Sequence, residues 1–262
     1  MKKICLCFFS GTGMTKYVID RLIREFETND ISVDCFNIEE ADVHNVALSG
    51  YDAFGMAYPV HAFNAPKIVI DFVKRLPKIN GINTFIVFTA GEENIINNAS
   101  SDLLIKKLRR KGHRIFYNKL VEMPSNFIVK YEKDRVNKIL DTANEVVPSI
   151  AKDIMSLKPH FEKKSFGSKM STFIGHSQRF GAPIMGKFFY AKKDCIYCGK
   201  CVKICPKKNI IMDEKFIRFK WRCCNCMRCV SQCPKNAISV RQPFKFICFD
   251  EWYDPEMFKP RK

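Results

Sequence analysis

The chain has 262 residues, 47% of them hydrophobic, which is enough for one large or two ordinary globular domains. No apolar run approaches the roughly 20 residues that a bilayer-spanning helix needs. The net charge of +17 is uneven: residues 1–151 carry 20 Lys and Arg against 18 Asp and Glu, whereas residues 152–262 carry 24 against 9. These properties argue against a disordered chain, and we expect no membrane span.

The N-terminal residues are basic and then apolar, as in a signal peptide. The apolar stretch is short, however, and it runs into Ser10-Gly11-Thr12-Gly13 without a small-residue cleavage site. We therefore expect a cytoplasmic protein.

The first 155 residues alternate strand-like and helix-like patterns. Apolar runs typical of strands occupy residues 3–9, 32–37, 53–58, 84–89 and 114–121. Patterns typical of helices occupy residues 14–26, 66–76, 102–111 and 134–155. Alternation of this kind predicts a parallel sheet covered on both faces. Residues 1–155 are therefore expected to form an α/β domain with a doubly wound, five-stranded parallel sheet of flavodoxin-like size.

The first strand leads into a loop of small and hydroxyl-bearing residues, followed by a helix. The loop consists of Ser10, Gly11, Thr12, Gly13, Met14 and Thr15. Backbone N–H groups and a helix N-terminus favour a phosphate at such a turn, although an ordinary turn with a helix cap has the same local sequence. The pattern is neither a Walker A loop nor Gly-x-Gly-x-x-Gly. It resembles the flavodoxin phosphate loop, Ser/Thr-x-Thr-Gly-x-Thr, at every fixed position, and this resemblance implies that the loop binds FMN.

Two more loops follow the third and fourth predicted strands, at the positions that flank the flavin ring in flavodoxins. The first contains Pro59, Val60, His61, Ala62, Phe63 and Asn64, and the second contains Thr89, Ala90 and Gly91. The resemblance implies that these residues also bind the cofactor. Phe63 and His61 are the candidates for stacking on the ring, with packing in the protein core as the alternative for each.

Residues 156–190 fit neither half of the chain. The segment is basic, and its glycines are interleaved with phenylalanines. A structureless loop of this length is uncommon in a compact protein. Two interpretations remain open: a bridge that packs along both domains, or a cap over a cofactor or partner-docking surface.

Nine of the 13 cysteines lie between Cys195 and Cys233, a distribution that favours metal binding over disulfides. Eight of these nine form two copies of Cys-x₂-Cys-x₂-Cys-x₃-Cys-Pro, 28 residues apart. In this pattern the first three cysteines of a run bind one 4Fe–4S cluster and the fourth binds the other. We therefore assign cluster 1 to Cys195, Cys198, Cys201 and Cys233, and cluster 2 to Cys205, Cys223, Cys226 and Cys229.

Two zinc sites are the alternative, but structural zinc sites use thiolate pairs separated by about 15 residues rather than two four-cysteine runs. Cys224 is out of register with the motif, and we treat it as a non-ligand. The motif region resembles bacterial-type two-cluster ferredoxins. Residues 191–262 are accordingly expected to form a small α+β ferredoxin domain with a C-terminal tail.

The order of the parts resembles the flavodoxin–ferredoxin fusion proteins of anaerobic bacteria and archaea. This resemblance implies electron transfer between FMN and two 4Fe–4S clusters, in a cytoplasmic oxidoreductase of an anaerobe. The basic surface suggests an acidic redox partner protein.

Two alternatives to an oxidoreductase remain. One is a pure electron carrier with no substrate at the flavin. The five histidines are scattered, so no catalytic residue is assigned, and a small-molecule substrate stays open. The other is a metal-stabilised nucleic-acid-binding protein, which the charge favours. No recognition motif accompanies the charge, so we expect no nucleic-acid partner.

Overall fold

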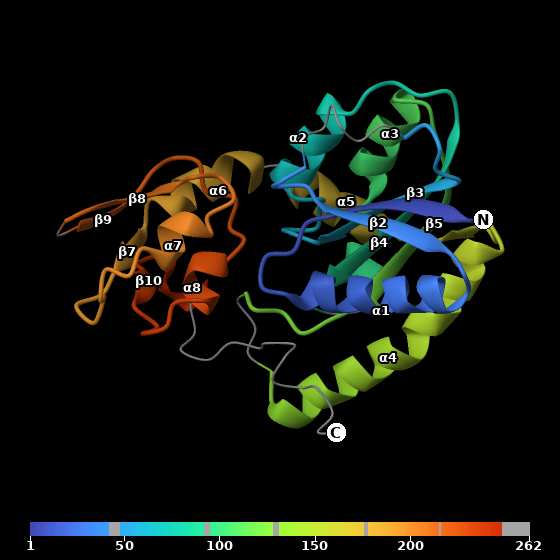
Figure 1. The fold of residues 1–262 in the computed structure, drawn as a ribbon. Coiled ribbons are helices and arrows are strands. Elements are labelled where there is room, and N and C mark those ends of the chain that lie inside the picture. Colours follow the sequence, from blue (N-terminus) through green and yellow to red (C-terminus); the bar gives the residue numbers. More distant parts are fainter. Residues whose placement is uncertain (42–47, 92–94, 128–130, 176–177, 215, 248–262) are drawn as a thin grey trace. The chain divides into compact units, whose positions relative to one another are not determined.

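The computed structural model describes residues 1–262 except 42–47, 92–94, 128–130, 176–177, 215 and 248–262. The chain forms two compact units, coloured along the sequence in Figure 1. Unit 1 comprises residues 1–124 and 133–176, and unit 2 comprises residues 125–132 and 177–262. The expected bridge, residues 156–190, is thus divided between the two units.

Unit 1 is built on a parallel sheet with strand order β2-β1-β3-β4-β5-β6. The strands are β1 (Lys3–Phe8), β2 (Ser32–Asn37), β3 (Ala53–Pro59), β4 (Ile82–Ala90), β5 (His113–Glu122) and β6 (His160–Phe161). The first five follow the flavodoxin-like order 2-1-3-4-5, so the expected fold class is confirmed. The two-residue β6 adds a sixth strand to the five expected from the sequence.

Helices cover both faces of this sheet, as expected for a doubly wound fold (Figure 1). Helices α1 (Met14–Thr28) and α4 (Lys133–Met155) contact each other on one face, and α2 (Lys67–Arg75) and α3 (Asp102–Arg110) contact each other on the opposite face. The central strands β1, β3 and β4 are buried over nearly their whole length, because apolar side chains on both of their faces meet helices. No helix in the described part of the chain is long and apolar enough to cross a bilayer.

The first part of the expected bridge is ordered within unit 1. After β6, residues Phe166–Gly175 form helix α5, which packs against the short 3₁₀ helix η2 (Ile95–Asn97). The second part belongs to unit 2, where residues Gln178–Gly186 form helix α6.

Unit 2 is a small α+β domain, also as expected. Its two antiparallel strand pairs are β7 (Phe189–Ala191) with β10 (Ile238–Val240), and β8 (Ile210–Asp213) with β9 (Phe216–Phe219). The short helices α7 (Lys200–Lys203) and α8 (Arg228–Ser231) and the 3₁₀ helix η3 (Lys245–Ile247) complete it. Its core joins side chains from both strand pairs with the partly buried Phe127 from the 125–132 segment.

The backbone of unit 2 repeats itself with the 28-residue offset of the cysteine motif. Positive φ angles recur at three pairs of positions: Tyr197 and Asn225, Gly199 and Met227, and Lys208 and Asn236. Gly199 and Met227 are the left-handed N-caps of two four-residue helices, α7 and α8 respectively. The repeated motif therefore corresponds to a repeated local structure.

Candidate cofactor sites

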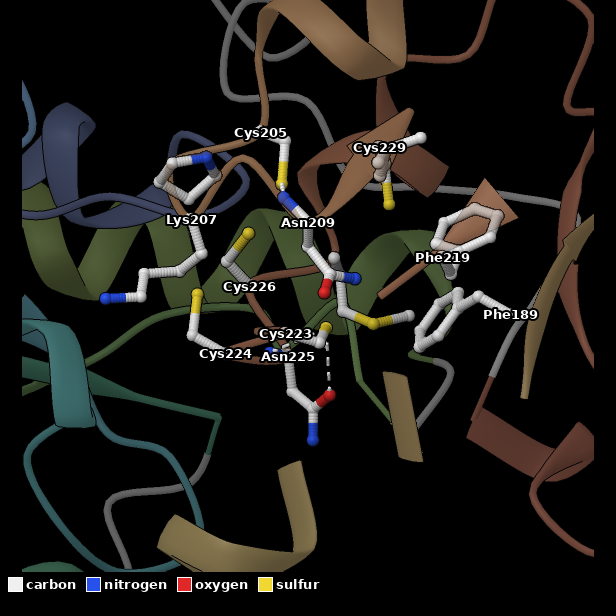
Figure 2. Close-up of a pocket in the computed structure, with 13 residues that line it drawn as sticks. Phe189, Cys205, Lys207, Asn209, Phe219, Cys223, Cys224, Asn225, Cys226 and Cys229 are labelled. Atoms are coloured by element: carbon white, nitrogen blue, oxygen red, sulfur yellow. Dashed lines mark hydrogen bonds between the residues drawn. The ribbon is translucent and has the colours of Figure 1, made fainter. Parts of the chain in front are cut away.

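Two cavities in unit 2 collect the cysteines of the repeated motif. Cavity 1 is lined by Cys195, Cys198, Cys201 and Cys233. Cavity 2 is lined by Cys205, Cys223, Cys226 and Cys229, and also by Cys224. Figure 2 shows cavity 2, with cysteine side chains from both copies of the motif around it. Each cavity therefore takes three motif cysteines from one copy and the fourth motif cysteine from the other, which is the grouping expected from the sequence.

The crossing cysteines receive hydrogen bonds from the backbone. The Asn209 N–H donates to Cys205 Sγ at 3.2 Å, and the Ala237 N–H donates to Cys233 Sγ at the same distance. In cavity 2 the Asn225 N–H also donates to Cys223 Sγ at 3.4 Å. Such donors stabilise negative charge on sulfur and orient the side chain.

Burial opposes ionisation of these thiols when nothing neutralises them. Burial raises the pKa of Cys201 to about 11 and that of Cys223 to about 12, and it raises the pKa of Cys229 well above its usual value. Neighbouring cysteines of the same cavity raise these pKa values further. A cationic iron–sulfur core would remove this penalty, because it balances the thiolate charge inside the cavity. The donor set and surroundings thus fit a 4Fe–4S cluster.

Among the described residues, no three His, Cys, Asp or Glu side chains form a group that could hold one ion. All 12 cysteines in the described part of the chain are free thiols, so none of those lining the cavities is paired in a disulfide.

Two features of cavity 2 could not be seen in the sequence pattern. The first is the close approach of helix α6, where a Cβ added to Gly186 would overlap the Cys223 Cβ and lie 3.3 Å from its Sγ. The second is Cys224, whose side chain is buried at the cavity wall rather than elsewhere in the core. Both depend on contacts that the motif spacing does not encode.

The three loops expected to bind a flavin lie at one edge of the sheet in unit 1. They follow β1, β3 and β4, which are neighbours in the sheet and run parallel, so their carboxyl ends meet. The Thr15 and Thr89 hydroxyls are hydrogen-bonded at 2.8 Å, and the Val60 N–H donates to the Thr89 carbonyl at 2.7 Å. In this strand order, the edge between β1 and β3 is the switch point where ligands bind.

The loop of residues 10–15 leads into a helix, α1, whose first turn has no acidic residue of its own. Gly13 is the N-cap, with the left-handed φ of 98° that glycine tolerates, and it makes no side-chain cap hydrogen bond. The first turn of α1 contains no Asp or Glu. One backbone N–H, that of Lys16, donates to the Ser10 hydroxyl at 3.3 Å. This end of the helix therefore fits a phosphate, which the helix dipole and backbone N–H groups would stabilise.

Residues 61–64 form a tight turn that presents Phe63. The His61 N–H donates to the Asn64 carbonyl and the Asn64 N–H to the His61 carbonyl, at 2.9 and 3.1 Å. Phe63 is 38% exposed, so it is not a core residue. His61 packs edge-on against the buried Phe9 ring, with 6.4 Å between ring centroids. Core packing is thus the wrong alternative for Phe63, whereas His61 contacts the core.

Helix α5 supports this turn. The Thr172 hydroxyl donates to the Phe63 carbonyl at 3.1 Å, and the Asn64 side-chain amide donates to the Thr172 carbonyl at 2.8 Å. Asn64 is buried although it lies in a surface turn. This part of the expected bridge therefore packs on one of the loops expected to border the flavin.

Comparison with known families matches residues 187–234 to a family described as a 4Fe-4S dicluster domain. Among curated proteins, none matches the chain. Solved structures with similar folds include a flavodoxin of Streptococcus pneumonia TIGR4, with 16% identity and a TM-score of 0.44 over 59% of this chain and 98% of that one. Flavodoxin 1 of Bacillus cereus has 19% identity and a TM-score of 0.41, over 56% and 97% of the two chains.

Part of a larger protein of known structure also has a similar fold. Rubredoxin oxygen:oxidoreductase from the anaerobe Desulfovibrio gigas has 12% identity and a TM-score of 0.40, over 60% of this chain and 37% of that one. The fold class of unit 1 rests on its own strand order and direction. Unit 1 therefore has a flavodoxin-like topology, and the stretch that matches the dicluster family, residues 187–234, lies in unit 2.

Proposed function

We propose that the protein transfers electrons between FMN bound in unit 1 and two 4Fe–4S clusters bound in unit 2. The observation that carries this proposal is the pair of cavities, each lined by four motif cysteines drawn from both copies. Cys195, Cys198, Cys201 and Cys233 would hold cluster 1, and Cys205, Cys223, Cys226 and Cys229 would hold cluster 2.

FMN takes up two electrons and can release them singly, whereas each cluster carries one, so the pair suits conversion between two-electron and one-electron chemistry. In unit 1, the backbone of residues 10–15 would bind the FMN phosphate. Residues 59–64 and 89–91 would border the ring, with Phe63 the residue best exposed to stack on it. The Thr172 hydroxyl and the Asn64 amide would hold that turn in place.

Residues 10–15, 59–64 and 89–91 offer few groups for acid–base chemistry at the flavin. Of the three sheet-edge loops, only the 59–64 loop contains a histidine, His61, and it packs on Phe9. A carrier that exchanges electrons with partner proteins fits this composition as well as a reductase of a small molecule does. Free thiols and oxygen-sensitive clusters suit a reducing cytoplasm and an anaerobic host.

The test is purification without oxygen, followed by counts of iron, sulfide and flavin. We expect about eight irons and one FMN per chain, with a broad cluster absorbance near ~400 nm. Zinc in place of iron would contradict the proposal. Eight irons without flavin would reject only the proposed FMN site in unit 1 and would leave the clusters of unit 2 in place.

A reduction experiment separates the carrier from the enzyme. The loaded protein is reduced with dithionite and mixed with an oxidised acidic ferredoxin or with candidate small-molecule substrates. Rapid reoxidation by the acidic ferredoxin, with no reaction with the small molecules, supports the electron carrier. Formation of a product from a small molecule supports the reductase.

A further inference from the structure

The two cysteine cavities differ by one thiol. Cys224 in the second copy of the motif corresponds to Ile196 in the first. Both residues line their cavities, but Ile196 is 56% exposed whereas Cys224 is 8% exposed. Cavity 2 is therefore lined by five cysteines, one more than a 4Fe–4S cluster needs, and cavity 1 by four.

The fifth thiol lies against a ligand cysteine. The Cys224 and Cys226 side chains are hydrogen-bonded to each other, and the Cys224 side chain is buried at the cavity wall. Asn225, with a left-handed φ of 53°, lies between the two cysteines in the chain. Figure 2 shows the Cys224 and Cys226 side chains side by side. The Cys224 sulfur therefore lies beside the sulfur that is proposed to bind iron.

We propose that Cys224 is a reserve ligand of cavity 2, which binds the cluster iron in place of Cys226. This inference rests on the proposed function, because it requires a 4Fe–4S cluster in cavity 2. The exchange needs no oxidant or reductant. The bond from iron to the Cys226 sulfur breaks and one to the Cys224 sulfur forms, while the Cys224 thiol gives up a proton and the released Cys226 thiolate takes one up.

The experiment compares four variants of the full chain: Cys226→Ala, Cys224→Ala, the double variant, and Cys198→Ala. Alanine supplies no donor atom, whereas serine could itself bind iron. Cys198 is the counterpart of Cys226 in the first copy, where no fifth cysteine lines the cavity. Each protein is reconstituted with iron and sulfide without oxygen, and iron per chain and the EPR spectrum of the dithionite-reduced protein are recorded.

The reserve ligand predicts a specific pattern of iron content. Wild type, Cys224→Ala and Cys226→Ala retain about eight irons. The double variant and Cys198→Ala each retain about seven or fewer, because one iron has lost its cysteine. The EPR spectrum of Cys226→Ala keeps two interacting clusters, with a changed signal from the one whose ligand is exchanged.

Two outcomes overturn the inference while leaving the proposed function intact. One is loss of iron in Cys226→Ala to the level of Cys198→Ala. The other is a double variant that retains as much iron as Cys226→Ala, which would mean that Cys224 supplies no ligand. Wild-type protein that binds no iron would instead reject the proposed function itself.

Discussion

His113 is a buried histidine whose protonation state is coupled to folding. It lies at the start of β5, where its Nδ1 is 2.9 Å from the Thr84 hydroxyl and its ring packs on Phe54. Its Nε2 has no hydrogen-bond partner among the described residues. Burial lowers the pKa of His113 from 6.5 to about 4, because a charged ring would be poorly solvated there.

This pKa shift predicts a loss of stability in acid. Between pH 6.5 and 4 the unfolded chain binds the His113 proton and the folded chain does not. The free energy of unfolding therefore falls as pH decreases through that window, by about 3 kcal/mol in total. Urea unfolding of wild type and His113→Gln at pH 7, 6 and 5 measures the effect. The free energy of unfolding of the wild type relative to the variant should decrease as the pH is lowered from 7 to 5. A difference between the two proteins that does not change with pH would contradict the prediction.

Gly186 is the residue through which helix α6 approaches cavity 2. Because an added Cβ would overlap Cys223, we expect Gly186→Ala to displace that cysteine and to weaken cluster 2. Gly181→Ala, in the same helix, is the matched control, since nothing lies within 4 Å of its added Cβ. Iron release to a chelator should become about tenfold or more faster in Gly186→Ala, as expected for a loss of about 1.4 kcal/mol or more. Equal release rates in the two variants would show that Cys223 accommodates the methyl group.

The residue scale also shows how far sequence reasoning reaches. The grouping of the crossed cysteines could be predicted, because the duplication and the Cys-Pro spacing are local patterns with a known consequence. The burial of Cys224 in cavity 2 and the contact of Gly186 with Cys223 could not, because both arise from tertiary packing. In the sequence, Cys224 differs from the motif cysteines only in register, which predicted that it is not a ligand.

At the scale of elements, the central strands were the most predictable. β1, β3 and β4 are buried on both faces, so their sequences are continuous apolar runs, and each lies within about two residues of its expected bounds. β6 and helices α5 and α6 were not predictable. A two-residue strand has no periodicity, and α5 combines glycines with exposed phenylalanines, so its contacts with the 61–64 turn and η2 support it more than propensity does.

The contact between α5 and the 61–64 turn predicts an effect on flavin binding. Thr172→Val keeps the shape of the side chain but removes the hydrogen bond to the Phe63 carbonyl. One such bond is worth about 1 kcal/mol, so the Kd for FMN should rise about fivefold.

Fluorescence titration of flavin-free protein measures this Kd. Thr142→Val is the control, because the Thr142 hydroxyl bonds only to Lys138 in its own helix, α4. An unchanged Kd in Thr172→Val would show that the hydrogen bond from α5 does not affect FMN binding. An equal rise of the Kd in both variants would indicate a general loss of stability.

At the scale of the whole molecule, the chain passes between its two units three times. Residues 125–132 leave unit 1, contribute Phe127 to the core of unit 2, and return to unit 1 at α4. Sequence patterns place domain boundaries where the amino-acid composition changes, near residues 155 and 190. The eight residues 125–132 are too few to change the composition detectably, so their place in unit 2 could not be predicted. The parallel sheet of unit 1 and the duplication in unit 2 could be predicted because each follows from a repeated pattern.

Charge is the other property that distinguishes the two units. Residues 177–247 contain 16 Lys and Arg against 3 Asp and Glu, whereas residues 1–151 are nearly neutral. Two oxidised clusters would contribute only about −2 each, counting their thiolates, so unit 2 stays strongly basic when loaded. A basic surface around one-electron carriers attracts acidic redox proteins, and dissolved salt screens that attraction over about 10 Å at 0.1 M.

Electron transfer to an acidic carrier should therefore slow with ionic strength. We expect the second-order rate constant to fall about tenfold between ~20 and ~500 mM salt in stopped-flow mixing, whereas a basic carrier should show no such fall. Lys203→Glu, on the exposed surface of α7, should reduce the low-salt rate more than Lys138→Glu on α4 in unit 1. A rate that is independent of salt, or equal effects of the two substitutions, would mean that the charge of unit 2 does not guide its partner. The excess of lysine and arginine there would then need an explanation other than docking.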